Sequence, residues 1–419
     1  MNNEHVQARK TGKCRFCGQP LRFTFVDLGM SPLCESFLSL EQLNQMEVFY
    51  PLHVFVCENC FLVQLEEFVN PEKIFTEYAY FSSYADTWLK HAQNYTHFVT
   101  ERFDLSKESF VVEVASNDGY LLQYFVQKNI PVLGIEPAKN VAKVAIEKGV
   151  PTLTEFFGEK LAIQLLEQGK QADLIVGNNV LAQVPDINDF VRGMKTLLKP
   201  GGIVTVEFPH LLRLMEENQF DTIYHEHFSY FSFITAEKIF SAHGLILFDV
   251  EEISTHGGSL RIYGRHVNNS ALPITDRALE LHEREVNAGF TKIEYYSAFD
   301  EQVKATKRKL LSFLIEAKKQ DKSIAGYGAP GKGNTLLNYC GIRTDFLDYT
   351  VDRNPYKHGK FLPGTHIPIY RPEKIFETKP DYVFILPWNF KDEIMVQMAE
   401  IREWGGQFVV PIPEVKVYK

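Results

Sequence analysis

The chain of 419 residues carries 53 acidic and 44 basic side chains, a formal net charge of −9, and 45% hydrophobic residues. This composition is typical of a globular protein with room for two or three domains. The acidic balance argues against a general binder of nucleic acid or anionic membranes, although a local basic site could still hold a small anionic ligand.

The first residues, MNNEHVQARKTGK, are polar and lack the apolar core of a secretory signal. No apolar run approaches the roughly 18 residues that a membrane-spanning helix needs. We therefore expect a soluble, cytoplasmic protein with no membrane partner.

Four of the six cysteines form two Cys-x-x-Cys pairs, Cys14 with Cys17 and Cys57 with Cys60, and 39 residues separate the pairs. The intervening segment is long enough to loop back and bring the four thiolates into a tetrahedron, which is the arrangement of a structural Zn²⁺ site. Cys34 and Cys340 are isolated in the sequence, and we interpret them as packing residues.

Two blocks of the chain alternate short apolar runs with helical segments, the rhythm of a parallel α/β sheet. The first block holds VVEVAS, PVLGIEP, ADLIVGNN, GGIVTVEFP and LILFDVEEI, between about residues 110 and 250. A charged, helix-favouring stretch from about 276 to 321 separates it from SIAGYGAP, FLDYTVDR, DYVFILPW and GQFVVPIP. We predict two doubly wound sheets.

The first block predicts a nucleoside site. FVVEVASNDG is a strand that ends in a small-residue turn, and Glu136 ends the next strand, where an acidic side chain can accept hydrogen bonds from both ribose hydroxyls. With the ADLI strand and the LKPGG turn, this order of motifs resembles a class I methyltransferase domain that binds S-adenosylmethionine (SAM). The turn departs from the common glycine pattern at Ala115 and Asn117. The expected cofactor-binding residues are Glu113, Ala115, Ser116, Asn117, Gly119, Glu136 and Asn178.

Tyr224, His225, Glu226 and His227 are consecutive. His225 and His227 could share a metal on one face of an extended segment, or one neutral imidazole could act as a base beside a substrate carbonyl. A hydrogen-bonded structural cluster is the third interpretation.

Near the C-terminus, Gly326, Gly328 and Gly331 match G-x-G-x-x-G, and Asp352 follows about twenty residues later. This is the pattern of a dinucleotide site, but Pro330 and Lys332 flank the third glycine, which favours a loop that receives a phosphate.

YHEHFSYFS, EVASNDG, NNVLAQVPDINDF, HGGSLRIYG, GYGAPGKGNTLLNYC and the paired cysteines together resemble the sugar C-3-methyltransferases that act on dTDP-4-keto-deoxyhexoses. The resemblance covers essentially the whole chain. It implies a zinc-binding module (1–70), a SAM-dependent methyltransferase domain (71–255) and a C-terminal Rossmann-like domain (256–419) that binds the sugar nucleotide together with the central one. The implied enzyme (EC 2.1.1 class) methylates C3 of an NDP-4-keto-6-deoxyhexose in deoxysugar biosynthesis.

The resemblance also implies roles for individual residues. His227 would be the base, Glu226 and Tyr224 would orient it, and Tyr78 would line the sugar pocket. Gln183 stands where related sequences have histidine, and an amide cannot exchange a proton near neutral pH. The expected substrate-binding residues are Gln183, His225, Arg261, Gly328, Lys332, Asn334, Arg353 and Lys357.

Two other functions are weighed against this one. An NAD-dependent nucleotide-sugar oxidoreductase would use the C-terminal glycine-rich loop as a dinucleotide site. A zinc protein directed to nucleic acid, such as an RNA methyltransferase, would need clusters of Lys and Arg that the acidic chain lacks.

Overall fold

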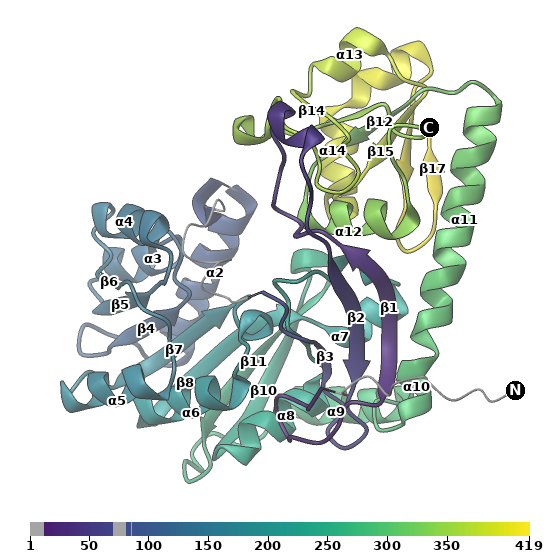
Figure 1. Ribbon diagram of the computed structural model, residues 1–419. Helices are drawn as coiled ribbons and strands as arrows, with labels where there is room; N and C mark the ends of the chain where they lie inside the picture. The colour runs from purple at the N-terminus through teal and green to yellow at the C-terminus, as the bar shows by residue number, and fades with distance from the viewer. Residues whose placement is uncertain (1–11, 70–80, 85) are drawn as a thin grey trace, which may run out of the picture. The chain divides into compact units, whose positions relative to one another are not determined.

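The computed structural model describes residues 12–69, 81–84 and 86–419. The chain divides into two compact units, each built from three segments (Figure 1). The first unit comprises Cys57–His210, Phe228–Thr291 and the described part of Met1–Arg22. The second comprises Phe23–Val56, Leu211–His227 and Lys292–Lys419. The boundaries at residues 70 and 255 that the resemblance implied stay predictions.

A seven-stranded sheet forms the centre of the first unit. Six strands run in the same direction, and β11 pairs antiparallel with both of its neighbours. The predicted apolar runs are its buried strands, because a parallel sheet covered on both faces needs near-continuous apolar sequence. The order across the sheet is β10 (Leu245–Ile253), β11 (Ser259–His266), β8 (Leu198–Pro209), β7 (Ala172–Asn178), β4 (Val111–Val114), β5 (Val132–Ile135) and β6 (Thr152–Leu153).

Helices cover both faces of this sheet, with α2, α3 and α4 on one side and α5 and α6 on the other (Figure 1). Ala92, Tyr95 and Val99 of α2 share one core with Phe125 of α3 and Ala145 of α4. The side chain of Asp186 caps the N-terminus of α6, and the side chain of Ser232 caps the N-terminus of α8. The bounds are α2 (Asp86–Arg102), α3 (Leu122–Gln127), α4 (Lys139–Glu147), α5 (Glu159–Glu167), α6 (Ile187–Leu197), α8 (Phe233–Ala242) and α9 (Asp276–Ala288). The short strands β3 (Val63–Leu65) and β9 (Ser229–Tyr230) pair with each other.

The second unit contains a six-stranded sheet whose five parallel strands carry β17 antiparallel at one edge. Its order is β14 (Ile369–Tyr370), β13 (Tyr349–Val351), β12 (Ile324–Tyr327), β15 (Tyr382–Ile385), β16 (Gln407–Val410) and β17 (Lys416–Tyr418). The helices are α7 (Leu211–Glu216), α10 (Ile293–Ser297), α11 (Phe299–Lys319), α12 (Gly331–Cys340), α13 (Lys374–Thr378) and α14 (Lys391–Gln397). The predicted second α/β sheet is therefore present.

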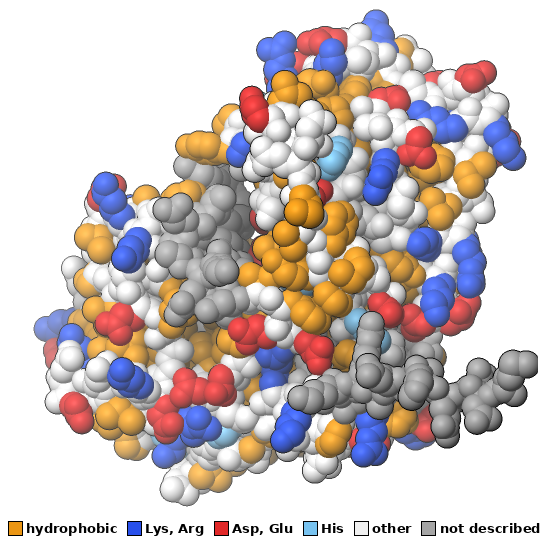
Figure 2. All heavy atoms as spheres, viewed as in Figure 1, with side chains coloured by type: hydrophobic (Ala, Val, Ile, Leu, Met, Phe, Trp, Pro, Cys, Tyr) orange, Lys and Arg blue, Asp and Glu red, His pale blue; other side chains and the backbone are white. Residues whose placement is uncertain are grey.

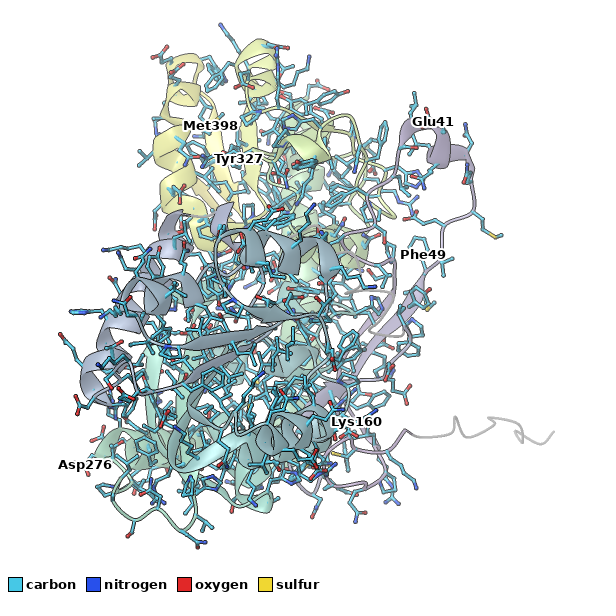
Figure 3. The ribbon with its side chains drawn as sticks, turned by 90° about the vertical axis from the view of Figure 1, so that its left-hand side faces the viewer. Glu41, Phe49, Lys160, Asp276, Tyr327 and Met398 are labelled. Carbon is cyan, nitrogen blue, oxygen red and sulfur yellow. The ribbon has the colours of Figure 1, made fainter. Side chains whose placement is uncertain are left out.

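An antiparallel hairpin also belongs to the second unit. It consists of β1 (Phe23–Ser31) and β2 (Tyr50–Val56), and Phe25 stacks on Phe299 of α11 with ring centroids 4.7 Å apart. The long connection between the strands contains the short helix η1 (Leu40–Asn44); Figure 3 labels Glu41 on this helix and Phe49 just before β2.

The predicted fold class is confirmed. In the first unit, the strand order with its antiparallel β11 is that of class I methyltransferases, and the second unit has a Rossmann-like sheet. Among the described residues, no helix combines the length and the apolar character needed to cross a membrane.

Candidate functional site

The four predicted metal ligands, Cys14, Cys17, Cys57 and Cys60, come together in the first unit. Their sulfur atoms all lie within 4.8 Å of one another, and the Cys14–Cys60 and Cys17–Cys57 pairs are each 3.5 Å apart. Zinc–sulfur bonds of about 2.3 Å in a tetrahedron require sulfur–sulfur distances of about 3.8 Å, so the cluster fits Zn²⁺. The Gln64 amide donates to the Cys14 sulfur at 3.2 Å, a contact that would stabilise a thiolate.

The knuckle between Cys14 and Cys17 is attached to the loop that follows β7. Arg15 donates to the Pro185 carbonyl at 2.8 Å, and the Asn188 amide donates to the Arg15 and Phe16 carbonyls at 3.1 and 3.0 Å. Gln183 is the last residue of the short helix at the start of this loop. A zinc ion would therefore also fix the backbone near Gln183.

The turn after β4 has the left-handed backbone that usually selects glycine. Ala115, Asn117 and Gly119 have φ values of 57°, 48° and 75°. The Glu136 carboxylate accepts hydrogen bonds from the amides of Asn117 and Ala138, each at 2.9 Å, and so holds the turn against the end of β5. The departures from the glycine pattern therefore leave the shape of the turn intact.

Buried polar atoms gather around this turn. Within the described residues, Ser116 Oγ and Asn178 Oδ1 lack a hydrogen-bond partner, and the Glu113 carboxyl lies beside the Tyr120 hydroxyl. Burial raises the pKa of Glu113 well above its usual range, and it also raises the pKa of Glu136. Such acceptors suit the ammonium and hydroxyl groups of SAM, and thus the residues present fit this cofactor.

An aromatic and ionic cluster that the sequence interpretation missed adjoins the turn. Trp88 stacks on Tyr120, whose hydroxyl accepts from Asn178 at 3.4 Å, and on His91. His91 lies 3.0 Å from the buried Glu207 carboxylate. No local spacing could reveal this cluster, since its members come from four separate segments.

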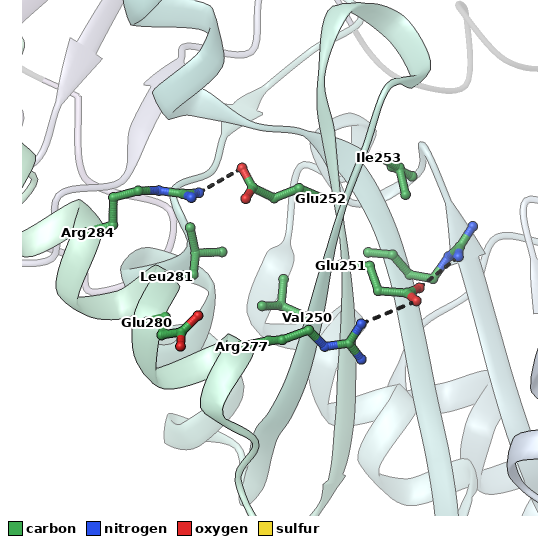
Figure 4. Close-up of a pocket in the computed structure, with 9 residues that line it drawn as sticks. Val250, Glu251, Glu252, Ile253, Arg277, Glu280, Leu281 and Arg284 are labelled. Atoms are coloured by element: carbon green, nitrogen blue, oxygen red, sulfur yellow. Dashed lines mark hydrogen bonds and ion pairs between the residues drawn. The ribbon is translucent and has the colours of Figure 1, made fainter.

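Arg261, predicted to bind substrate, lies in this ionic cluster. Its guanidinium donates to Glu207 at 2.7 Å and to Glu251 at 2.9 Å. It also lines a hollow of about 410 Å³ beside β10, where Arg277 pairs with Glu251 and Arg284 with Glu252 (Figure 4). Its predicted contact with substrate stays a prediction.

His227 lies in the second unit, where the Thr222 carbonyl accepts the Nδ1–H of its ring at 3.1 Å. The neighbouring Tyr224 ring lies with its centroid 4.1 Å from that of His227. Burial lowers the pKa of His227 to about 4, and the nearby charge of Lys332 acts in the same direction. The imidazole is therefore neutral near pH 7, with Nε2 as its basic nitrogen.

His225 and Glu226 have different surroundings. The ring of His225 is within hydrogen-bond distance of the Pro51 carbonyl at 3.2 Å and packs edge-on against Tyr50. Glu226 is buried and faces the Cys34 sulfur at 3.8 Å; burial, reinforced by the charge of Glu35, raises the pKa of Glu226 to about 7. The contacts of His225 are thus those of a packing residue, and its role in substrate binding stays a prediction.

The glycine-rich loop between β12 and α12 is fixed by contacts within the second unit. Gly328 has φ of 90°, and a Cβ there would lie 2.5 Å from Pro387. Asp352 accepts from the Ala329 amide at 2.7 Å. The carboxylate expected at the ribose of a dinucleotide therefore holds the loop itself.

Other predicted substrate ligands surround the start of α12. Lys357 donates to the Ala329 carbonyl at 2.8 Å and lies 3.9 Å from Glu35. The buried Asn334 amide donates to the Cys34 carbonyl at 2.5 Å, and its own oxygen has no hydrogen-bond partner among the described residues. Arg353 is largely exposed, 3.7 Å from Glu393. Tyr78 lies outside the described residues.

Comparison with known proteins identifies the family. Residues 14–75 match a zinc binding domain, residues 88–249 a methyltransferase domain, and residues 254–413 the C-methyltransferase C-terminal domain. C-methyltransferase NovU of Streptomyces niveus is 35% identical over 412 residues, which cover 98% of this chain and 97% of that protein. A ubiquinone biosynthesis O-methyltransferase of Bordetella avium is 33% identical over 98 residues, 22% of this chain and 40% of that one.

Solved structures resemble less of the chain. Magnesium protoporphyrin IX methyltransferase from Synechocystis PCC 6803 is 14% identical with a TM-score of 0.33, covering 42% of this chain and 78% of that one. The CcbJ methyltransferase from Streptomyces caelestis is 13% identical with a TM-score of 0.34, covering 42% and 89%. The similarity to NovU, by contrast, extends over nearly the full length of both chains. The chain therefore belongs to the family of zinc-binding, SAM-dependent C-methyltransferases that includes NovU.

Proposed function

We propose that the protein transfers a methyl group from SAM to C3 of an NDP-4-keto-6-deoxyhexose, in the formation of a branched deoxysugar. The observation that carries this proposal is the setting of His227. Its Nδ1–H donates to the Thr222 carbonyl, and burial keeps the ring neutral, so Nε2 is the basic atom. A neutral imidazole is a suitable base for a proton next to a carbonyl.

In the proposed reaction the C4 ketone acidifies the C3 hydrogen and His227 removes it, which leaves an enolate. SAM supplies the electrophilic methyl group that C3 then takes. The Tyr224 ring, tilted by 35° against the ring of His227, restricts rotation of the imidazole. Gln183 can hydrogen-bond a sugar oxygen but cannot act as acid or base, so His227 is the only predicted base.

We assign SAM binding to the polar cluster around the turn after β4, with Ser116 and Asn178 as open acceptors, Glu113 beside them, and Glu136 as the support of the turn. Gly328, Lys332, Asn334 and Lys357, around the start of α12, are the proposed ligands of the sugar nucleotide. The N-terminus of a helix and two lysine ammonium groups can together bind an anionic diphosphate.

The two competing functions have less support. The C-terminal region matches a C-methyltransferase domain, and Asp352 is engaged with its own loop, so the glycine pattern does not favour an NAD site. On the face that Figure 2 shows, Lys and Arg side chains alternate with Asp and Glu, which is not the surface expected for nucleic acid.

Mass spectrometry tests the proposal. The protein would be incubated with SAM and, in turn, dTDP-, GDP- and CDP-4-keto-6-deoxyhexoses labelled with deuterium at C3. We expect one of them to gain a methyl group and lose the label. His227→Asn should lower turnover at least about 100-fold and leave SAM affinity unchanged, because the base is removed but the cofactor site is not.

His97→Asn is the matched control, since His97 is an exposed histidine on α2. Near-normal turnover of His227→Asn would contradict the assignment of the base. Methylation of none of the keto-sugars would contradict the substrate class.

A further inference from the structure

Lys332 occupies an unusual position for a lysine. It is the second residue of α12, where the helix dipole is positive, and burial lowers the pKa of its ammonium group. Both effects oppose a positive charge at this place. A lysine at a position that disfavours its positive charge indicates that the charge has a function.

Three side chains hold the ammonium group in place. Its Nζ donates to Asn389 Oδ1 at 2.9 Å and lies 4.6 Å from the centre of the Trp388 ring. Trp388 Nε1 donates at 2.7 Å to the buried carboxylate of Asp221, whose charge favours the charged form of Lys332. Among the described residues the second Asp221 oxygen has no hydrogen-bond partner.

One short helix, η4, connects Asp221 to the candidate base His227. The helix η4 (Phe220–Thr222) carries Asp221, and the carbonyl of its last residue, Thr222, orients His227. Thr335 of α12 donates to the Ile223 carbonyl at 2.9 Å, so α12 is fixed to the segment that leads to His227. The ammonium and the imidazole are therefore positioned by one rigid set of contacts.

Removal of the C3 proton moves negative charge onto the C4 oxygen, and a neutral base cannot stabilise that charge. We propose that Lys332 is the group that binds the C4 oxygen and stabilises the enolate, with Asp221, Trp388 and Asn389 as its positioning residues. Only one of the three N–H bonds of the ammonium is used by a described residue, Asn389, which leaves donors for a substrate oxygen.

The C3–H bond breaks and its proton goes to His227 Nε2, while the electron pair forms the C3–C4 double bond. The carbonyl pair moves to the C4 oxygen, where the Lys332 ammonium compensates the charge. C3 then bonds to the methyl group as the sulfur–methyl bond of SAM breaks and S-adenosylhomocysteine leaves. The ketone is restored, and the imidazolium returns its proton to water.

This inference rests on the proposed function and competes with the assignment of Lys332 to the diphosphate. The two roles predict different defects. A diphosphate ligand acts on the affinity for the nucleotide, whereas an enolate-stabilising group acts on the removal of the C3 proton.

The experiment follows exchange of the C3 hydrogen in D₂O by NMR, with S-adenosylhomocysteine in place of SAM so that no methyl transfer occurs. At saturating dTDP-4-keto-sugar, Lys332→Met should lower the exchange rate about 100- to 1000-fold, and dTDP affinity measured by calorimetry should change by less than about threefold. Lys332→Gln is tested in the same way in case the methionine variant does not fold.

Lys307→Met is the matched control, because Lys307 of α11 also contacts an aromatic ring, Tyr339, and is not among the proposed substrate ligands. Wild-type exchange in both Lys332 variants would overturn the inference. So would a large loss of dTDP affinity with an unchanged exchange rate, which would make Lys332 a diphosphate ligand. Absence of exchange and of methylation in the wild-type protein would instead contradict the proposed function.

Discussion

Gly331 lies so close to Cys34 that a Cβ on the glycine would stand 2.9 Å from the cysteine sulfur. The backbone amide of Gly331 also donates to the Glu35 carboxylate, whose side chain is 40% exposed. Cys34 and Glu35 of the same unit thus pack against the first residue of α12. The third glycine of the G-x-G-x-x-G pattern is explained by close packing of the chain.

Gly331→Ala should therefore lower the free energy of unfolding by about 1–3 kcal/mol, because the added methyl group overpacks the contact with Cys34. Combining it with Cys34→Ala should restore part of that loss. Urea unfolding of the two single variants and the double variant measures the coupling. Gly201→Ala is the control, since a Cβ at Gly201 meets no neighbouring atom within 4 Å. A Gly331→Ala variant as stable as the wild type would contradict the packing argument.

The sequence predicted both sheets because buried parallel strands are apolar throughout, as in Val111–Val114. It did not show that β11 inserts antiparallel between β8 and β10, where the buried Arg261 meets Glu207. Nor did it show that the hairpin between the cysteine pairs belongs to the second unit. Both features depend on contacts between distant segments, which local patterns do not encode.

The candidate site was predictable where neighbours in sequence act together. The turn from Ala115 to Gly119 and the pair of cysteine knuckles are local motifs, and both form as expected. Asp221 and Trp388 are 167 residues apart, and only the fold brings the carboxylate to the indole. The sequence did not reveal that the Thr222 carbonyl accepts the Nδ1–H of His227, and the orienting role of Glu226 and Tyr224 stays a prediction.

Removal of one zinc ligand should destabilise the first unit. Cys14→Ser should abolish stoichiometric zinc and lower the melting temperature, because three thiolates and a hydroxyl hold the ion weakly and the knuckle anchors the loop after β7. Cys340→Ser is the control, as Cys340 is also buried but is not one of the four clustered cysteines. Metal analysis by mass spectrometry and thermal unfolding provide the measurements. Retention of one zinc per chain in Cys14→Ser would show that this cluster is not the metal site.

Glu136→Ala should weaken SAM binding about 10-fold or more. The substitution removes the acceptor for the Asn117 and Ala138 amides, so the turn that shapes the proposed cofactor site loses its support. Isothermal titration calorimetry with SAM measures the effect, and Glu147→Ala, at the end of the adjacent α4, is the control. Equal SAM affinity in Glu136→Ala and wild type would place the cofactor elsewhere.

Glu226 should make the stability of the protein fall as the pH rises from about 4.5 to 7. Its folded-state pKa is about 7, so the native protein keeps a proton that the unfolded chain, titrating near 4.5, has already released. This difference removes about 3 kcal/mol from the free energy of unfolding over that interval.

Glu226→Gln cannot titrate, and its stability relative to the wild type should increase across the same interval, as measured by urea unfolding at pH 5, 6, 7 and 8. Glu35, whose pKa burial also raises, remains in the variant and should leave a residual slope. The exposed Glu400→Gln variant should follow the wild-type profile, and a Glu226→Gln profile parallel to it would show that Glu226 ionises normally in the folded protein.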